Sequence, residues 1–319
     1  MITIVLFIVG ILLLIKGADF LVDAAVAIAR RLKVSYLLIG LTVVAFGTSA
    51  PELFVNLIAS IRGNTAIAVG NILGSNISNI LLILGVAAVI HPLAVTRQTI
   101  WREIPFSLLA VVVLGFVAND RLIDGGGDSV VSRIDGLVLL SFLTVFLYYL
   151  FAITNPSDGF DDVIVAKDYG LGRAAFMVVL GLACMLLGGK WIVEGAVSIA
   201  ARLGLSESVV GLSMVAVGTS LPELATSVVA AYKKRADIAV GNVVGSNIFN
   251  IFMVLGVSAV VRPLPFETDN NLDVGMVVFS GLLLFLFMFS GKKGRVDRWE
   301  GVLALTIYAG YLSFRLLVR

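Results

Sequence analysis

Long apolar stretches separated by short polar breaks run through almost the whole chain of 319 residues. A helix that crosses a bilayer needs about 20 mainly apolar residues, and the chain has ten stretches that approach or exceed this length. The fourth is the weakest, because Pro105 and Asn119 bracket a short apolar core. The predicted spans are residues 2–29, 36–61, 66–90, 104–118, 134–153, 174–201, 207–232, 238–261, 273–290 and 299–318.

Two of the breaks are longer than the others. Residues 154–173 contain four aspartates and little apolar periodicity, so we expect a linker between two halves of the chain. Residues 119–133 include three consecutive glycines and are expected to form a flexible hairpin loop. The pattern therefore predicts an all-α membrane protein, with five spans in residues 1–153 and five in residues 174–319.

Two polar blocks occur once in each half, at a constant offset of 171 residues. GTSAPE at 47–52 returns as GTSLPE at 218–223, and GNILGSNISNI at 70–80 returns as GNVVGSNIFNI at 241–251. An odd number of spans per half inserts the second half upside down relative to the first. Inverted repeats of this kind are the plan of many secondary transporters, which bind their substrate near the bilayer midplane where the halves meet.

The first block places a carboxylate and two hydroxyls on one face of the second span. Thr48, Ser49 and Glu52 follow Ala45 at helical spacing. Pro51 lacks an N–H and clashes with the carbonyl four residues earlier, so backbone oxygens of the preceding turn are expected to turn inward. At membrane depth such backbone is tolerated only where it lines a cavity or is buried in protein. The second half repeats the arrangement with Ala216, Thr219, Ser220, Pro222 and Glu223.

The second block adds amides and a hydroxyl to the candidate ligands. Asn71, Ser75 and Asn79 are spaced four residues apart, and Gly70 and Gly74 thin the helix for close approach. Four such segments would form an all-oxygen cage with two negative charges, which suits Ca²⁺ or, with less charge, Na⁺. Soft metals are disfavoured, because sulfur and imidazole ligands are lacking. The eighth span has the equivalents Asn242, Ser246, Asn250, Gly241 and Gly245.

Composition supports a membrane protein and argues against several other classes. The chain is 59% hydrophobic and 14% charged, with a mean hydropathy of +1.06, whereas soluble domains are about half apolar and a quarter charged. A net charge of +2 is too small to favour nucleic-acid binding. The single cysteine, Cys184, and the single histidine, His91, cannot build a disulfide or a zinc or copper site. No cofactor is expected.

Further charges lie inside two of the predicted spans. Lys16, Asp19 and Asp23 share one face of the first span, and Lys190 and Glu194 share one face of the sixth. Ion pairs between residues three or four apart would neutralise each set. We therefore favour structural pairing or interfacial placement over a role in an ion path.

Basic residues in the loops predict the orientation of the chain. With the N-terminus outside, the inner loops hold fourteen Lys and Arg residues and the outer side holds seven. Because cytoplasmic loops carry the excess of basic residues, both termini are predicted to be extracellular and the 154–173 linker cytoplasmic. The predicted location is the cell membrane.

The paired GTS-x-PE and GN-x-x-GSN-x-x-N blocks resemble the alpha repeats of the cation/calcium exchanger superfamily, and most closely those of prokaryotic sodium/calcium exchangers. The resemblance covers nearly the whole chain. It implies an antiporter that exchanges Na⁺ for Ca²⁺ by alternating access, with the first and sixth helices sliding beside a core bundle. It further implies that Glu52 and Glu223 ligate Ca²⁺ with help from backbone oxygens near Thr48 and Thr219. The implied Na⁺ ligands, alongside these glutamates and threonines, are Ser49, Ser75, Ser220, Ser246 and the carbonyls of Ala45 and Ala216.

Two details of the blocks refine the expected ions. Asn250 occupies a position where some members of the superfamily, including the potassium-dependent exchangers, have aspartate, and a neutral amide there argues against potassium co-transport. Proton/calcium exchangers of the superfamily usually have Asn-Ala where this chain has Thr-Ser in both halves, which favours sodium.

Three alternatives to sodium/calcium exchange stay open at this stage. A proton/calcium antiporter would use the same two glutamates. A channel fits less well, because paired inverted blocks suit alternating access more than a continuous pore. An enzyme with Glu52 and Glu223 as an acid–base pair would leave the duplicated amides unexplained, and the sequence has no HExxH motif. The expected partners are Ca²⁺, Na⁺ and the lipid bilayer. The oligomeric state is open, with a monomer among the options.

Overall fold

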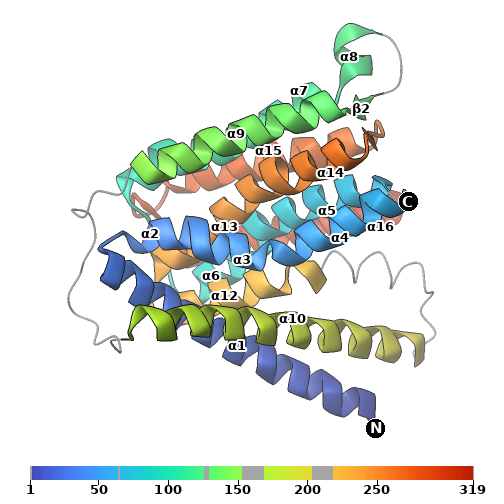
Figure 1. The fold of residues 1–319 in the computed structure, drawn as a ribbon. Helices are drawn as coiled ribbons and strands as arrows, with labels where there is room; N and C mark the ends of the chain where they lie inside the picture. Colours follow the sequence, from blue (N-terminus) through green and yellow to red (C-terminus); the bar gives the residue numbers. More distant parts are fainter. Residues whose placement is uncertain (1, 64, 126–128, 153–168, 203–217, 319) are drawn as a thin grey trace.

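The computed structural model describes residues 2–63, 65–125, 129–152, 169–202 and 218–318, and it is almost entirely helical (Figure 1). The α-helices are α1 (Ile2–Leu32), α2 (Tyr36–Ile39), α3 (Ala45–Thr48), α4 (Ala50–Arg62), α5 (Thr65–Ser78), α6 (Leu84–Ile90), α7 (Ile104–Val117), α8 (Asp120–Asp124), α9 (Arg133–Ala152), α10 (Leu171–Arg202), α12 (Leu221–Tyr232), α13 (Ala236–Phe249), α14 (Gly256–Val261), α15 (Asn270–Phe287) and α16 (Arg298–Val318).

Wider π-helical turns and two short strand pairs complete the secondary structure of the described residues. The π-helical segments are Gly40–Val44, Asn79–Ile83, Thr99–Glu103 and Asn250–Leu255. Both strand pairs are antiparallel and join the first half of the chain to the second. They are formed by β1 (Leu93–Ala94) with β4 (Arg295–Val296), and by β2 (Val130–Val131) with β3 (Leu264–Pro265).

The helices agree with most of the predicted spans. Within the described residues, seven helices are long and apolar enough to cross a membrane, and the bent pair of residues 36–48 and 50–62 gives an eighth. The tenth predicted span coincides with α16. The seventh lies largely outside the described residues, which resume at residue 218 shortly before α12. The count of ten spans therefore stays a prediction.

Two connections differ from expectation. Residues 119–133 were expected to form a flexible hairpin loop, but their described part contains α8 and β2. This segment is held by Asn119, whose side chain exchanges two 2.8 Å hydrogen bonds with the side chain of Asn271. The fourth span begins at Thr99 instead of residue 104, because a π-helical turn precedes α7 and Pro105 falls in the first turn of α7. The predicted linker lies mostly outside the described part of the chain.

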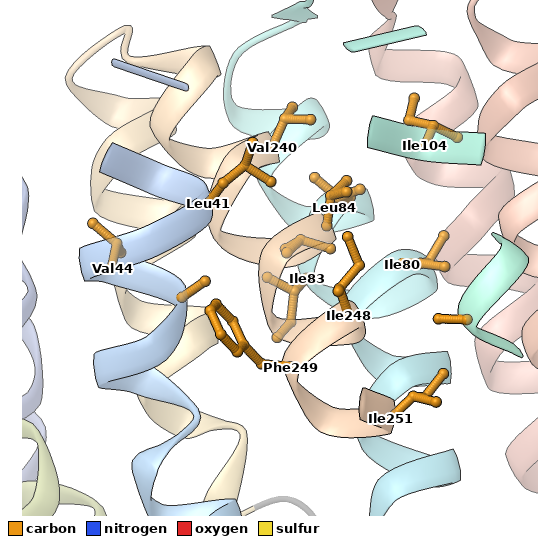
Figure 2. Close-up of a cluster of buried hydrophobic side chains, with 14 of the residues drawn as sticks. Leu41, Val44, Ile80, Ile83, Leu84, Ile104, Val240, Ile248, Phe249 and Ile251 are labelled. Atoms are coloured by element: carbon orange, nitrogen blue, oxygen red, sulfur yellow. The ribbon is translucent and has the colours of Figure 1, made fainter. Parts of the chain in front are cut away.

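The spans that carry the second polar blocks form the centre of the molecule. In the most apolar stretch of the α13–α14 span, 89% of the residues are buried, and in that of the α5–α6 span 78% are buried. The corresponding shares are 33% in α1, 22% in α9 and 28% in α10. The less buried helices therefore surround the centre and are available to face lipid. Figure 2 shows Leu41, from the segment before α3, beside Val240 of α13, with Ile83 and Ile248 of the central helices in the same buried cluster.

Two glycines bring α13 against the segment that leads into the first block. A Cβ atom at Gly241 would lie 2.9 Å from the carbonyl oxygen of Leu37, and one at Gly245 would lie 2.7 Å from the Cβ of Ala45. The close approach predicted for the second block is thus present in α13. For Gly70 and Gly74 it stays a prediction, because the equivalent facing segment falls within residues 203–217, outside the described residues.

We expect Gly245→Ala to lower the free energy of unfolding by about 1–3 kcal/mol, the usual effect of overpacking a tight contact. The measurement is thermal unfolding of the purified protein in detergent. Gly275 in α15 is the matched control, since it is exposed and a Cβ there would meet no described atom within 4 Å. Gly275→Ala should be neutral or stabilise by up to about 1 kcal/mol through helix propensity. Equal losses in both variants would contradict the close approach.

Candidate ion-binding site

Each first block interrupts its helix at the serine. Ser49 (φ −81°, ψ 1°) separates α3 from α4, and Ser220 (φ −88°, ψ 1°) directly precedes α12. In both cases the proline lies in the first turn of the new helix, where its missing N–H is tolerated. The helix axis bends by 41° at the first interruption. The backbone thus has the irregularity predicted from the proline, and it lies beside the block's glutamate.

The first block of each half binds the second block of the other half. Thr48 Oγ1 donates a hydrogen bond to Asn242 Oδ1 at 3.0 Å and lies 3.5 Å from Ser246 Oγ. The repeat-equivalent Thr219 Oγ1 donates to Asn71 Oδ1 at 3.4 Å. These contacts are related by the same offset of 171 residues that relates the sequence blocks. The two halves therefore meet through matching polar contacts.

The serines at the helix interruptions also reach across to the other half. Ser49 Oγ donates to Glu223 Oε1 at 3.3 Å, and Ser220 Oγ lies 3.2 Å from Ser75 Oγ. Every one of these side chains is buried. The hydroxyls of the first blocks thus line the boundary between the halves instead of facing lipid.

Both glutamates are fully buried, with 0% of each side chain exposed. The Glu52 carboxylate faces the hydroxyls of Thr219 and Ser220, but neither of its oxygens has a hydrogen-bond partner within the described residues. Glu223 keeps one such unpartnered oxygen, Oε2. No Lys or Arg of the described chain forms an ion pair with either carboxylate. Buried carboxylates are normally paired or bound to a metal ion, so this arrangement suits a cation.

Four asparagines form a closed cluster at the centre. Asn76 Nδ2 donates to the carbonyl of Asn247 at 3.3 Å, and Asn247 Nδ2 donates to the carbonyl of Asn76 at 3.4 Å. Asn79 Nδ2 donates to Asn247 Oδ1 at 2.9 Å, and Asn250 Nδ2 donates to Asn76 Oδ1 at 3.1 Å. The Oδ1 atoms of Asn79 and Asn250 are buried without a partner in the described part of the molecule. The cluster thus uses the amide N–H groups and leaves two oxygens for another ligand.

Eleven of the predicted site residues lie in the described part of the chain, and all are buried, with at most 6% exposure. The carbonyl of Ala45 is already an acceptor for Thr48 Oγ1 at 3.3 Å and for the Ser49 N–H at 3.0 Å. Ala216 lies outside the described residues. The residues brought to the boundary are Ala45, Thr48, Ser49, Glu52, Ser75, Asn79, Thr219, Ser220, Glu223, Ser246 and Asn250.

Sequence reasoning overlooked Asn76 and Asn247 as site residues. Each follows the serine of its GSN triplet by one position and so lies off the helix face that was traced through every fourth residue. Ser227 was also missed, and its Oγ accepts from Asn242 Nδ2 at 3.0 Å. The signal was available for the asparagines, because both copies of the block contain them.

The charges in the first span do not pair as the spacing suggested. Asp19 and Asp23 each lie 2.5 Å from Nζ of Lys233, which follows α12, and neither forms an ion pair with Lys16 within the described chain. The spacing rule failed here because a lysine from another helix is closer. The expected pair of Lys190 with Glu194 is present at 3.8 Å on an exposed surface.

A buried, oxygen-lined centre between two matching halves of a helical membrane protein defines a transporter of small cations. The sequence profile of the family described as sodium/calcium exchanger protein matches residues 2–152 and 173–317. The chain belongs to this family, whose members are exchangers and not enzymes.

Three known proteins show the extent of the similarity. The chain is 39% identical over 311 residues to the putative antiporter CaxA of Alkalimonas amylolytica, with 95% of each chain covered. It is 33% identical over 334 residues to the sodium/calcium exchanger MaX1 of Methanosarcina acetivorans, again with 95% of each covered. A solved structure of the sodium-calcium exchanger NCX_Mj matches with a TM-score of 0.83, at 33% identity and 98% coverage of both chains.

We expect Asn247→Ala to lower the free energy of unfolding by about 1–3 kcal/mol, because it leaves the buried Nδ2 of Asn79 and the carbonyl of Asn76 without their partners. Thermal unfolding in detergent measures the change. Asn270→Ala is the control, since the Asn270 side chain is only partly buried and forms no hydrogen bond among the described residues. A loss no larger than that of the control would mean that the asparagine cluster adds nothing to stability.

Proposed function

We propose that the chain exchanges Na⁺ for Ca²⁺ across the membrane by alternating access, with both ions bound between the two halves. The observation that carries this proposal is the pair of fully buried glutamates, one from each half, with three unpartnered carboxylate oxygens and no basic partner in the described chain. Support also comes from relatives, since MaX1 and NCX_Mj are both described as sodium/calcium exchangers.

Calcium would use both carboxylates. Ca²⁺ takes six to eight oxygen ligands at flexible geometry, and a divalent ion in a dry site needs two negative charges to offset its lost hydration. Glu52 and Glu223 supply these charges, with backbone oxygens near Thr48 and Thr219 beside them. The unpartnered oxygens of Asn79 and Asn250 are neutral candidates for the remaining positions.

Sodium would share the glutamates and use more of the neutral oxygens. A monovalent ion needs less negative charge, so the hydroxyls of Ser49, Ser75, Ser220 and Ser246 and the carbonyls of Ala45 and Ala216 suit it. Because both ions require the glutamates, they compete for one site. An empty site holds two carboxylates that repel each other, which disfavours a change of state until an ion is bound. Obligatory exchange follows from this competition.

The architecture that we propose has ten spans in two inverted repeats, residues 1–153 and 174–319, joined by the 154–173 linker. It is supported by contacts that obey the 171-residue offset, such as Thr48 with Asn242 and Thr219 with Asn71. We also propose that the protein lies in the cell membrane with both termini outside and the linker in the cytoplasm, on the basis of the basic residues in its loops.

Vesicles that contain the purified protein can separate sodium from proton coupling. An outward Na⁺ gradient is expected to drive accumulation of labelled Ca²⁺, and an outward proton gradient of the same size, without Na⁺, is expected to drive none. Dissipating the Na⁺ gradient with an ionophore should stop the uptake. Uptake that follows the proton gradient and ignores Na⁺ would instead establish the proton/calcium antiporter.

In the same assay Glu52→Gln and Glu223→Gln should each lower the rate of Ca²⁺ uptake by about a hundredfold or more, because losing one buried charge of a matched set is worth about 3 kcal/mol or more. Glu103→Gln is the matched control, since Glu103 is also 0% exposed but bonds to Tyr149 at 2.5 Å instead of lining the boundary. Near-normal uptake in either site variant would remove that glutamate from the site.

A further inference from the structure

Helices α1 and α10 pack against each other along one side of the molecule (Figure 1). Their backbones approach closely at two places along the pair. A Cβ added at Gly10 would lie 2.9 Å from the carbonyl oxygen of Gly188, and one added at Gly17 would lie 2.6 Å from the carbonyl oxygen of Gly181. The two helices thus form a closely packed pair that is less buried than the centre of the molecule.

A charged contact ties this pair to the helix that carries Glu223. Lys233 directly follows α12, and its Nζ lies 2.5 Å from Oδ1 of Asp19 and 2.5 Å from Oδ1 of Asp23 on α1. It also donates to the carbonyl oxygen of Asp19 at 3.3 Å. The three side chains are only 26%, 35% and 38% exposed. One lysine thus pairs with two carboxylates and links α1 to the end of α12.

The repeat contains the charges for a second contact of this kind, but the contact is not formed. At the offset of 171 residues, Lys233 corresponds to Arg62 at the end of α4, and Asp23 corresponds to Glu194 on α10. Arg62 forms no ion pair with any described residue. Glu194 lies 3.8 Å from Lys190 of its own helix, with side-chain exposures of 57% and 65%. The contact between α1 and the end of α12 is therefore formed, whereas the equivalent contact between α10 and the end of α4 is not.

We propose that Lys233 with Asp19 and Asp23 is a lock that holds one access state, and that Arg62 with Glu194 is the equivalent lock of the opposite state. This inference rests on the proposed alternating access. In a repeat protein that alternates, each half takes the conformation of the other in turn, so the contact at Lys233 is replaced by the contact at Arg62. The second lock is weaker, because Lys190 stands where the first lock has Asp19 and competes for Glu194. The state with the Lys233 lock closed is therefore the favoured one.

The test is the alkylation rate of a reporter cysteine, Ser227→Cys, in a Cys184→Ser background. Ser227 is fully buried on α12 between Glu223 and Lys233, so its reaction with a maleimide reports opening at the Lys233 end. Lys233→Gln is expected to raise the rate about fivefold, the ratio that corresponds to a partly exposed ion pair at the upper end of its usual range. Arg62→Gln is expected to lower the rate, because it removes the lock of the opposite state.

Two controls keep the result specific. Lys234→Gln removes the same charge from the same turn, at a lysine that forms no ion pair in the described chain, and should leave the rate unchanged. Lys233→Arg keeps the charge and should also leave it unchanged. If Lys233→Gln does not fold, the acidic partners on α1 and α10 provide the same test. Asp23→Asn should then raise the alkylation rate, and Glu194→Gln should lower it.

Equal alkylation rates in Lys233→Gln and Lys234→Gln would overturn the proposal. Faster alkylation in both Lys233→Gln and Arg62→Gln would also overturn it, because a general loosening of the structure raises the rate in both variants, whereas two opposing locks change it in opposite directions. The alkylation assay does not depend on ion transport, so it separates this proposal from the proposed function. If the two variants change the alkylation rate in opposite directions but the protein moves no Ca²⁺, the proposed locks are supported and only the assignment of the transported ions is rejected.

Discussion

The structure is organised around two buried carboxylates that repel each other and have no basic partner in the part of the chain that the structure describes. In a low-dielectric interior, an isolated charge is strongly disfavoured unless something compensates it. Hydroxyls of the opposite half face both Glu52 and Glu223, but three of the four carboxylate oxygens have no hydrogen-bond partner among the described residues. Under the proposed function, a bound cation would compensate the charge that remains. Losing that ion, or one carboxylate, would then change the charge of the whole centre and not a single contact.

Interruptions in the helices are what bring these oxygens to one place. A regular helix satisfies its own backbone and presents one face, but the breaks at Ser49 and Ser220 redirect the chain where each first block ends. Two of the π-helical segments start at Asn79 and Asn250, which are repeat equivalents. The helix face that the following residues present therefore changes at the same point in both halves. Such single wide turns are frequent at functional sites.

The sequence predicted the features that depend on local patterns and missed those that depend on contacts between distant helices. Apolar length gave most of the spans, and the duplicated blocks gave the two glutamates with their surrounding hydroxyls. The asparagine cluster escaped because tracing every fourth residue follows one helix face, whereas Asn76 and Asn247 point at each other across two helices. Lys233 was not expected beside Asp19, since only packing brings α12 to α1. The glycine-rich segment 119–133 looked irregular, but α8 and β2 are fixed by partners outside the segment, including Asn271.

The mutual bond between Asn76 and Asn247 has a consequence for how such a chain could arise. Each of these residues contacts its own repeat equivalent, so the contact is self-complementary, as in an isologous interface of a two-fold symmetric dimer. A single half meeting a second copy of itself in the opposite orientation would form the same four amide hydrogen bonds. Gene duplication and fusion would then add only a connecting segment to a centre that already existed. Afterwards, each half was free to diverge wherever it does not touch its twin.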